Sequence, residues 1–417
     1  MFAGTEFGVF FTVDGGGKWI KLSGKAPNIS FRDLAIQKRE NDLVGATFGR
    51  GFWILDDYTP LRHVSEQSLG QEAQLFPVRT AKWYIERRPL GGSRKASQGE
   101  AYFTASNPPF GAVFTYHLAD GYKTRKDSRK KEEKKIAKEG GDTPTPGWDA
   151  LIEEDLEPKP EIVLTVRDAE GALVRRLTAP AKGGFHRVAW DLRYPSTRPW
   201  TPPRTDRPDF GRRDRGGPLA PPGTYSVSLA KRVDGKLIDL GLSETFEVEP
   251  IHDGGTLKGA SIEERTAFVR RLAKTSGAVS AAGRIIGDSV QRAQAIQQVL
   301  LRSTLDDPSL DDKARDLERR LKLLRDRIGG NERRDMANDP GPVPIQSRLS
   351  VAQIGTGNST YGATPTHRQS LAIAEKQFAE VQRELDAIVS MEIPALEAAL
   401  EAAGVPWSPG RKIPGID

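Results

Sequence analysis

From residue 12 the chain reads Thr12-Val13-Asp14-Gly15-Gly16-Gly17-Lys18-Trp19. The apolar, β-prone residues 7–13 lead into this stretch, and Trp19 resumes an apolar segment after it. A short Asp carboxylate can accept backbone N–H groups across a turn, and glycines allow the positive φ that such turns need. We therefore expect a β-hairpin whose turn is held by Asp14, with the indole packed beneath it. The residues to which we assign this structural role are Thr12, Asp14, Gly16 and Trp19.

Three further β-prone segments follow at 31–37, 42–47 and 51–55. Four strands within residues 1–63 are typical of one blade of a radial β-structure. One blade cannot bury both of its faces, so it needs neighbouring blades. We therefore predict the last, incomplete blade of a β-propeller over 1–63.

Residues 73–250 show the alternation that half-buried strands produce. Apolar side chains recur at every second position in three clear runs, Ile162/Leu164/Val166, Val188/Trp190/Leu192 and Tyr225/Val227/Leu229. Several such strands with turn signals between them predict a small antiparallel β-sandwich. We expect two interruptions in it, a basic insertion at 123–157 and a loop rich in Pro, Arg and Gly at 194–217.

Residues 256–417 are rich in Ala, Leu, Arg and Glu at helical spacing. Ser261, followed three residues later by Glu264, predicts a capping box at the start of a first helix. A second helix ends at Gly329-Gly330 and places its apolar residues at steps of four and three. These residues are Leu310, Ala314, Leu317, Leu321, Leu324 and Ile328. With a third stripe near the C-terminus, the pattern predicts an antiparallel three-helix bundle with an irregular arm at 331–365.

The composition excludes several classes of protein. The 417 residues contain no Cys, which excludes disulfide scaffolds, thiol nucleophiles and iron–sulfur clusters. Between Lys123 and Lys138 lie nine basic and three acidic residues, a surplus equal to the whole net charge of +6. Because no aromatic residue interleaves this run, it predicts a solvated insertion rather than a nucleic-acid site. We expect no membrane partner, and no signal peptide opens the sequence.

The stretch from Thr12 to Trp19 resembles the Asp-box, Ser/Thr-x-Asp-x-Gly-x-Thr/Ser-Trp, the signature of BNR-repeat β-propellers. Lys18 departs from the hydroxyl residue that is usual at its position. Three more stretches are similar to the closing blade of bacterial BNR proteins known as glycosyl-hydrolase-like or sortilin-like. They are residues 2–10, 32–35 and 46–57.

The likeness covers nearly the whole chain. In that group an immunoglobulin-like domain and a helical tail follow the propeller. Residues 185–195 and 217–225 resemble the former, and 395–407 resemble the latter. The resemblance implies an immunoglobulin-like (fibronectin type III-like) sandwich over 73–250, a secreted or cell-envelope setting, and upstream blades that this sequence lacks.

Carboxylates suited to glycoside hydrolysis are not evident. Such chemistry uses two carboxyl groups about 5–5.5 Å apart for retention, or about 6.5–9.5 Å apart for inversion. Asp56-Asp57 and Glu153-Glu154-Asp155 are available, but acids adjacent in sequence do not predict such a pair, and we interpret them as loop or turn acids. We predict no catalytic residue in this chain.

Two residues are candidates for contact with a ligand. A sialidase-like site would need arginines on the rim of the propeller, and Arg50 is the one candidate in the expected blade. Gly49-Arg50-Gly51 is interpreted more simply as a turn. Trp200 belongs to a group of aromatics that could stack on a sugar ring or peptide, or instead anchor the loop. The others are Trp190, Tyr194 and Phe210. The histidines have no metal-ligand spacing, so we predict neither a metal nor a cofactor.

Three functions stay open. The leading interpretation is a non-catalytic C-terminal accessory part of a glycosyl-hydrolase-like BNR propeller protein, whose partners are the upstream blades. The second is a fragment of a carbohydrate-active glycoside hydrolase whose catalytic residues lie in those blades. The third is a sortilin-like, peptide-binding module. The substrate, the oligomeric state and the role of 123–138 do not follow from the sequence.

Overall fold

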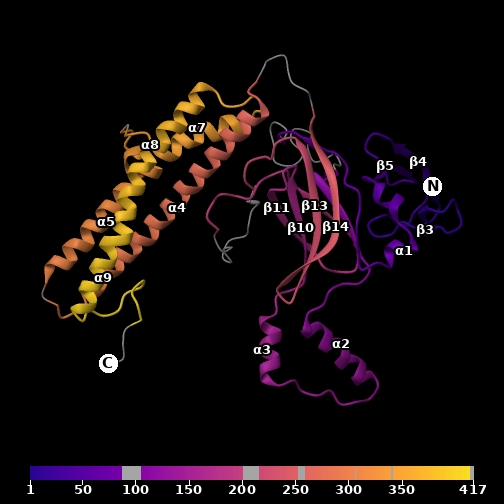
Figure 1. The fold of residues 1–417 in the computed structure, drawn as a ribbon, viewed down its shortest axis with the longest axis horizontal. Helices are drawn as coiled ribbons and strands as arrows, with labels where there is room; N and C mark the ends of the chain where they lie inside the picture. Colours follow the sequence, from indigo (N-terminus) through magenta and orange to yellow (C-terminus); the bar gives the residue numbers. More distant parts are fainter. Residues whose placement is uncertain (87–104, 201–215, 252–258, 306, 340, 414–417) are drawn as a thin grey trace. The chain divides into compact units, whose positions relative to one another are not determined.

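The computed structural model describes residues 1–86, 105–200, 216–251, 259–305, 307–339 and 341–413. The fold is mixed β and α, as the sequence predicts (Figure 1). The chain divides into two compact units. The first comprises Met1–Arg193 and Pro222–Ile251, and the second comprises Tyr194–Pro221 and His252–Asp417.

Two small antiparallel sheets open the first unit, of orders β1-β2-β3 and β4-β5-β6. Their strands are β1 (Phe2–Thr5), β2 (Gly8–Phe11), β3 (Ile20–Lys21), β4 (Phe31–Gln37), β5 (Asp42–Thr47) and β6 (Phe52–Leu55). The expectation of four strands was therefore wrong. A tight hairpin at Gly8 (φ +122°), where the Thr5 hydroxyl donates to the Gly8 carbonyl at 2.9 Å, adds β1 ahead of β2.

The two small sheets share one apolar cluster. Val9 of β2, Phe31 of β4, Leu43 of β5 and Tyr58 are buried in it. The ring of Phe31 lies over Gly45, where an added Cβ would come within 2.7 Å of the ring. A short connection follows, with a 3-10 helix (Thr59–His63) and α1 (Glu66–Leu69).

Two larger sheets complete the β part of this unit. One has the order β12-β9-β7 and the other β11-β10-β13-β14-β8, with β8 parallel to β14. The strands are β7 (Ala73–Leu75), β8 (Ala81–Trp83), β9 (Ala112–Leu118), β10 (Glu161–Asp168), β11 (Leu173–Pro180), β12 (Gly184–Trp190), β13 (Gly223–Val233) and β14 (Lys236–Pro250). Aromatic contacts join the two sheets, with ring centroids 5.5 Å apart for Phe114 and Phe246 and 5.1 Å apart for Trp190 and Tyr225. The predicted alternation is confirmed in β13, which buries Tyr225, Val227 and Leu229 but not the serines between them. It was wrong for β10, which buries consecutive residues from Ile162 to Val166.

The expected basic insertion lies between β9 and β10 and is largely helical. It contains α2 (Arg125–Lys138) and α3 (Trp148–Leu156). Neither helix buries a residue.

Helices form most of the second unit (Figure 1). They are α4 (Ile262–Leu300), α5 (Pro308–Gly329), α6 (Glu332–Met336), α7 (Ile345–Gly357), α8 (Pro365–Ala387), a π-helical turn (Ile388–Glu392) and α9 (Ile393–Ala402). The Ser261 hydroxyl accepts the Glu264 N–H at 3.2 Å, which is one half of the predicted capping box. All six apolar residues predicted for the second helix are buried in α5, which ends at Gly330 (φ +96°).

The prediction of an irregular arm at 331–365 was wrong for a large part of its length. α7 buries Ile345, Leu349, Ala352 and Thr356 on one side. Its prolines precede the helix, and Pro344 is its N-cap, where a missing N–H costs no helical hydrogen bond. The proline-rich stretch before Ile345 therefore marked a helix start.

Stability of the second unit should depend on the buried stripe of α5. We expect Leu321→Ala, at a side chain with 0% exposure, to lower the free energy of unfolding by about 2–5 kcal/mol, because the truncation leaves a cavity. Leu323→Ala, at a 54% exposed position of the same helix, should cost less than about 0.5 kcal/mol. Urea unfolding followed by circular dichroism at the helical band measures both. Equal losses would contradict the packing described.

Candidate functional site

The turn after β2 is built around the Asp14 carboxylate. Asp14 Oδ1 accepts the Thr12 hydroxyl at 2.6 Å and the backbone N–H groups of Gly16 and Lys18 at 3.3 and 3.1 Å. The Gly16 N–H also donates to Thr12 Oγ1 at 3.0 Å. Gly15 and Gly16 have φ of +79° and +112°, which only glycine adopts readily.

These bonds show that the Asp14 carboxylate stabilises the turn. The Thr12 hydroxyl, and next the Lys18 N–H, lower the pKa of Asp14 from its usual 3.8 to about 2. A carboxylate held in its ionised form by three local hydrogen bonds is a poor proton donor. Trp19 is 44% exposed, although its Nε1 lies 3.9 Å from where a Gly16 Cβ would be, so the indole covers the turn only in part.

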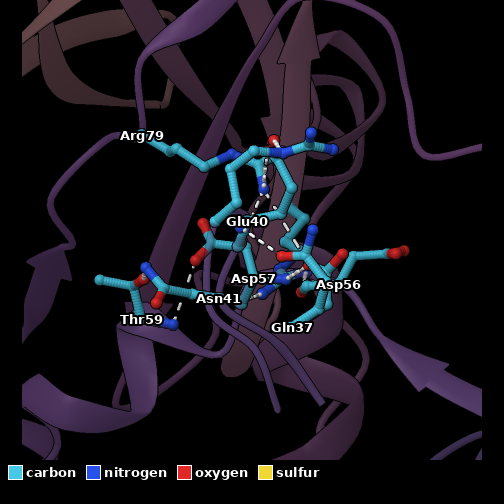
Figure 2. Close-up of polar contacts among 10 residues, drawn as sticks. Gln37, Glu40, Asn41, Asp56, Asp57, Thr59 and Arg79 are labelled. Carbon is cyan, nitrogen blue, oxygen red and sulfur yellow. Dashed lines mark hydrogen bonds and ion pairs between the residues drawn. The ribbon is translucent and has the colours of Figure 1, made fainter. Parts of the chain in front are cut away.

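A second polar cluster gathers at the loops joining β4 to β5 and following β6 (Figure 2). The Arg79 guanidinium donates to the Glu40 carbonyl at 2.8 Å and lies 3.1 Å from Glu40 Oε2. Asp42 Oδ1 accepts the Asp57 N–H at 2.9 Å, and Asp57 Oδ1 accepts the Thr59 N–H at 3.1 Å. Each of these acids therefore holds a turn in place.

Arg187 of β12 completes this cluster from the larger sheets. Its guanidinium donates to the backbone carbonyls of Asp56 (2.6 Å) and Asp57. The Asp56 side chain is half-buried, and burial, with the nearby Asp42 carboxylate, raises its pKa in spite of Arg187. A carboxyl group of raised pKa is what a general acid requires.

The space beside Asp56 nevertheless excludes a sugar substrate. A cavity of about 70 Å³ lies between Asp56, Arg79, Arg187 and the wall formed by Pro108 and Pro109. Ligand pockets typically measure about 300–1,000 Å³, whereas one water occupies about 30 Å³. The cluster therefore joins the β6 turn to the outer face of β12 and leaves room for solvent alone.

Two buried polar atoms on the same face have no partner. Gln74 of β7 and His117 of β9 are opposite each other in the sheet register. Gln74 Oε1 and His117 Nδ1 are buried without a hydrogen bond among the described residues. Burial, followed by the charge of His186, lowers the pKa of His117, so its neutral form is favoured. The ring of Phe185 covers it, with centroids 4.8 Å apart.

The structure separates the remaining predicted site residues. Arg50 is exposed in the turn between β5 and β6, where the Thr47 N–H donates to the Gly51 carbonyl at 3.0 Å, so the predicted turn is confirmed. Trp200 is 80% exposed in the second unit, where its carbonyl accepts Arg284 at 3.1 Å. Phe210 lies outside the described residues. Arg50 belongs to the first unit and Trp200 to the second.

The acids Glu153, Glu154 and Asp155 lie on α3 and form ion pairs with α2. Arg129 donates to both oxygens of Glu154 at 2.6 and 2.7 Å. This pairing lowers the pKa of Glu154 and removes it as a proton donor. The sequence did not predict the roles of Arg79, which lies between β7 and β8, and of Arg187 in β12, because an arginine on the surface does not indicate its distant partner.

Within the described ranges, no group of three or more His, Asp or Glu side chains is arranged to hold a metal ion. No helix in the same part of the chain is both long and apolar enough to span a membrane. Comparison of the chain with protein-family models, curated proteins and solved structures gave no match.

The Asp14 turn should respond to pH in a defined direction. Because the folded pKa lies below the unfolded one, the stabilisation by Asp14 is fully present above about pH 3.8 and is lost as pH falls through about 2. Thr12→Val, which removes the largest contribution, should raise the pKa of Asp14. Carboxyl-carbon NMR titration measures the shift. Thr47→Val, in a distant turn, is the control, and an unchanged Asp14 titration in Thr12→Val would refute the assignment.

Proposed function

We propose that this chain is a non-catalytic accessory part of a glycosyl-hydrolase-like BNR propeller protein, with a structural and binding role. In this proposal, β1 to β6 supply propeller-blade strands, and the two larger sheets form an immunoglobulin-like sandwich. The long helices form a three-helix bundle. The full protein would act in a secreted or cell-envelope setting.

The observation that carries the proposal is the outer face of the sheet β4-β5-β6. Strand register places Val44 and Ile54 opposite each other, and Ala46 opposite Phe52. Phe52 is 75% and Ile54 is 59% exposed, whereas the opposite face contributes Leu43 to the buried cluster. A sheet with apolar side chains on both faces is suited to lie between two neighbours.

The unpaired edges of the small sheets support the same interpretation. β4 and β6 are the outer strands of their sheet, and β1 and β3 are the outer strands of theirs. Open edges beside exposed aromatics are normally protected or paired, because they otherwise drive association. Further β-sheets, as in a propeller, would cover both the edge and the face.

The acids support a non-catalytic role. Asp14, Asp57 and Glu154 each hold backbone or arginine partners, and the cavity beside Asp56 has the size of a few waters. The hydrolase alternative therefore requires catalytic groups outside this chain.

Exposed sheet surface should make the isolated chain associate. We expect concentration-dependent self-association in sedimentation velocity up to about 100 µM, because unpaired apolar strands associate in this range. Phe52→Ser/Ile54→Ser should reduce it. Leu237→Ser/Ile238→Ser, at side chains 50% and 45% exposed in β14, is the matched control. A wild-type chain that stays monomeric throughout would count against the docking role.

Enzymatic assays test the non-catalytic role directly. We expect no hydrolysis of sialosides or β-glucans by this chain, because Asp14, Asp57 and Glu154 are held by local partners and the cavity beside Asp56 measures about 70 Å³. Reproducible turnover that Asp56→Asn abolishes, and that the exposed-site change Asp33→Asn leaves intact, would overturn the proposal in favour of a hydrolase.

A further inference from the structure

A short segment of the second unit, residues 194–200, lies along helix α4. None of these residues is part of a helix or strand. A proline disfavours helical backbone in the residue before it, so Pro195 and Pro199 favour extended backbone at Tyr194 and Arg198. The segment therefore contacts α4 as an extended peptide would.

Two arginines of α4 bind the ends of this segment. The Arg270 guanidinium lies 4.3 Å from the centroid of the Tyr194 ring and donates to the Tyr194 hydroxyl. Arg284 donates to the Trp200 carbonyl at 3.1 Å. Neither arginine has a carboxylate partner among the described residues, whereas two other arginines of α4 pair with glutamates of α8 and α9. The segment therefore supplies the described polar partners of both side chains.

The middle of the segment approaches α4 at Gly277. The Thr197 hydroxyl donates to the Ala273 carbonyl at 2.7 Å. A Cβ added at Gly277 would come within 2.4 Å of the Thr197 carbonyl oxygen. Glycine weakens the interior of a helix relative to alanine, but at this position it is the residue that allows the segment to approach.

The contacts with the segment lie on the side of α4 that faces away from its core residues. Arg270, Gly277 and Arg284 are spaced seven residues apart, so they share one side of the helix. Buried apolar residues repeat with the same spacing two residues further on, which places them about 200° around the helix. They are Leu272, Val279 and Ile286. Gly277 is nevertheless buried, and the segment that covers it accounts for this burial.

The repeat of the segment matches the repeat of the helix. The residues that contact α4 are Tyr194, Thr197 and Trp200, at every third position. Three residues of an extended chain span about 9 Å, and seven residues of an α-helix span about 10.5 Å. The contacts can therefore repeat along the helix without distortion of either partner.

We propose that this side of α4 is a recognition site for an extended peptide that carries a Tyr and, three residues later, a Thr. Arg270 would select the aromatic ring, and the small surface at Gly277 would select a close backbone approach beside the Thr. Arg284 would bind a carbonyl group without regard to its side chain, because Trp200 is 80% exposed and contributes its carbonyl. The proposal concerns the helical unit and does not depend on the proposed propeller role.

In this structure residues 194–200 occupy the site as an intramolecular competitor. Thr197 is exposed and Tyr194 is half-buried, so few apolar contacts hold the segment. A single hydrogen bond adds little net stability, because it replaces bonds to water. The covalent connection, however, keeps a tethered segment at an effective concentration of about 1 mM. A second peptide therefore competes well only when the tethered segment is released.

Fluorescence anisotropy of a labelled peptide with the sequence of residues 194–200 tests the proposal. In the whole chain, Tyr194→Ala/Thr197→Ala should release the tethered segment. We expect this variant to bind the peptide at least about tenfold more tightly than the wild-type chain does, because the competitor is gone. A control peptide with Ala at the Tyr and Thr positions should not bind.

A third substitution in the released variant locates the site. Gly277→Ala should abolish peptide binding and leave the helical circular dichroism intact, because alanine favours a helix. The matched control is Gly283→Ala, where an added Cβ meets no atom within 4 Å, and it should bind as before. The proposal would be overturned if the released variant failed to bind the peptide or bound it no better than the wild-type chain. Binding that persisted in Gly277→Ala would overturn it as well.

Discussion

The burial of strand β9 on both faces is the constraint on which the first unit depends. Its inward side chains, among them Phe114 and Tyr116, are fully buried between the two larger sheets. Its outward side chains Thr115 and His117 are buried as well, at 6% and 8% exposure. The Phe76 N–H donates to the Thr115 carbonyl at 3.0 Å, which extends the pairing of β7 with β9. On the outer face the Phe185 ring lies against His117, with centroids 4.8 Å apart, and stacks on Phe76 at 5.6 Å.

This arrangement leaves Gln74 Oε1 and His117 Nδ1 without hydrogen-bond partners among the described residues. On the same face of the sheet, Arg187 lies opposite Thr115 and donates to two successive carbonyls of the turn after β6. A charge-assisted hydrogen bond contributes about 1.5–3 kcal/mol when its geometry is good, although exposure of the Arg187 side chain reduces this. These bonds tie the turn after β6 to β12.

Contacts between residues close in sequence were predictable, and contacts between distant ones were not. The Asp14 turn uses partners two to four residues away, and the stripe of α5 repeats every three or four residues, so both follow from local chemistry. The bonds from Arg187 to Asp56 and Asp57 span more than a hundred residues. The extra strand β1 was missed because Phe7 and Gly8 looked like the start of a strand rather than a hairpin. No pattern in the sequence predicts to which distant turn an exposed arginine will donate its hydrogen bonds.

The helix pair α2–α3 affects how the sequence of this protein can evolve. Substitutions accumulate most easily where a side chain supports nothing else, and most destabilising replacements in a domain arise in its core. The helix pair is anchored through a few charged pairs near Arg125, so its outer positions can vary without endangering the strands on either side of it. Relatives with the same sheets would therefore be free to acquire, exchange or lose this appendage.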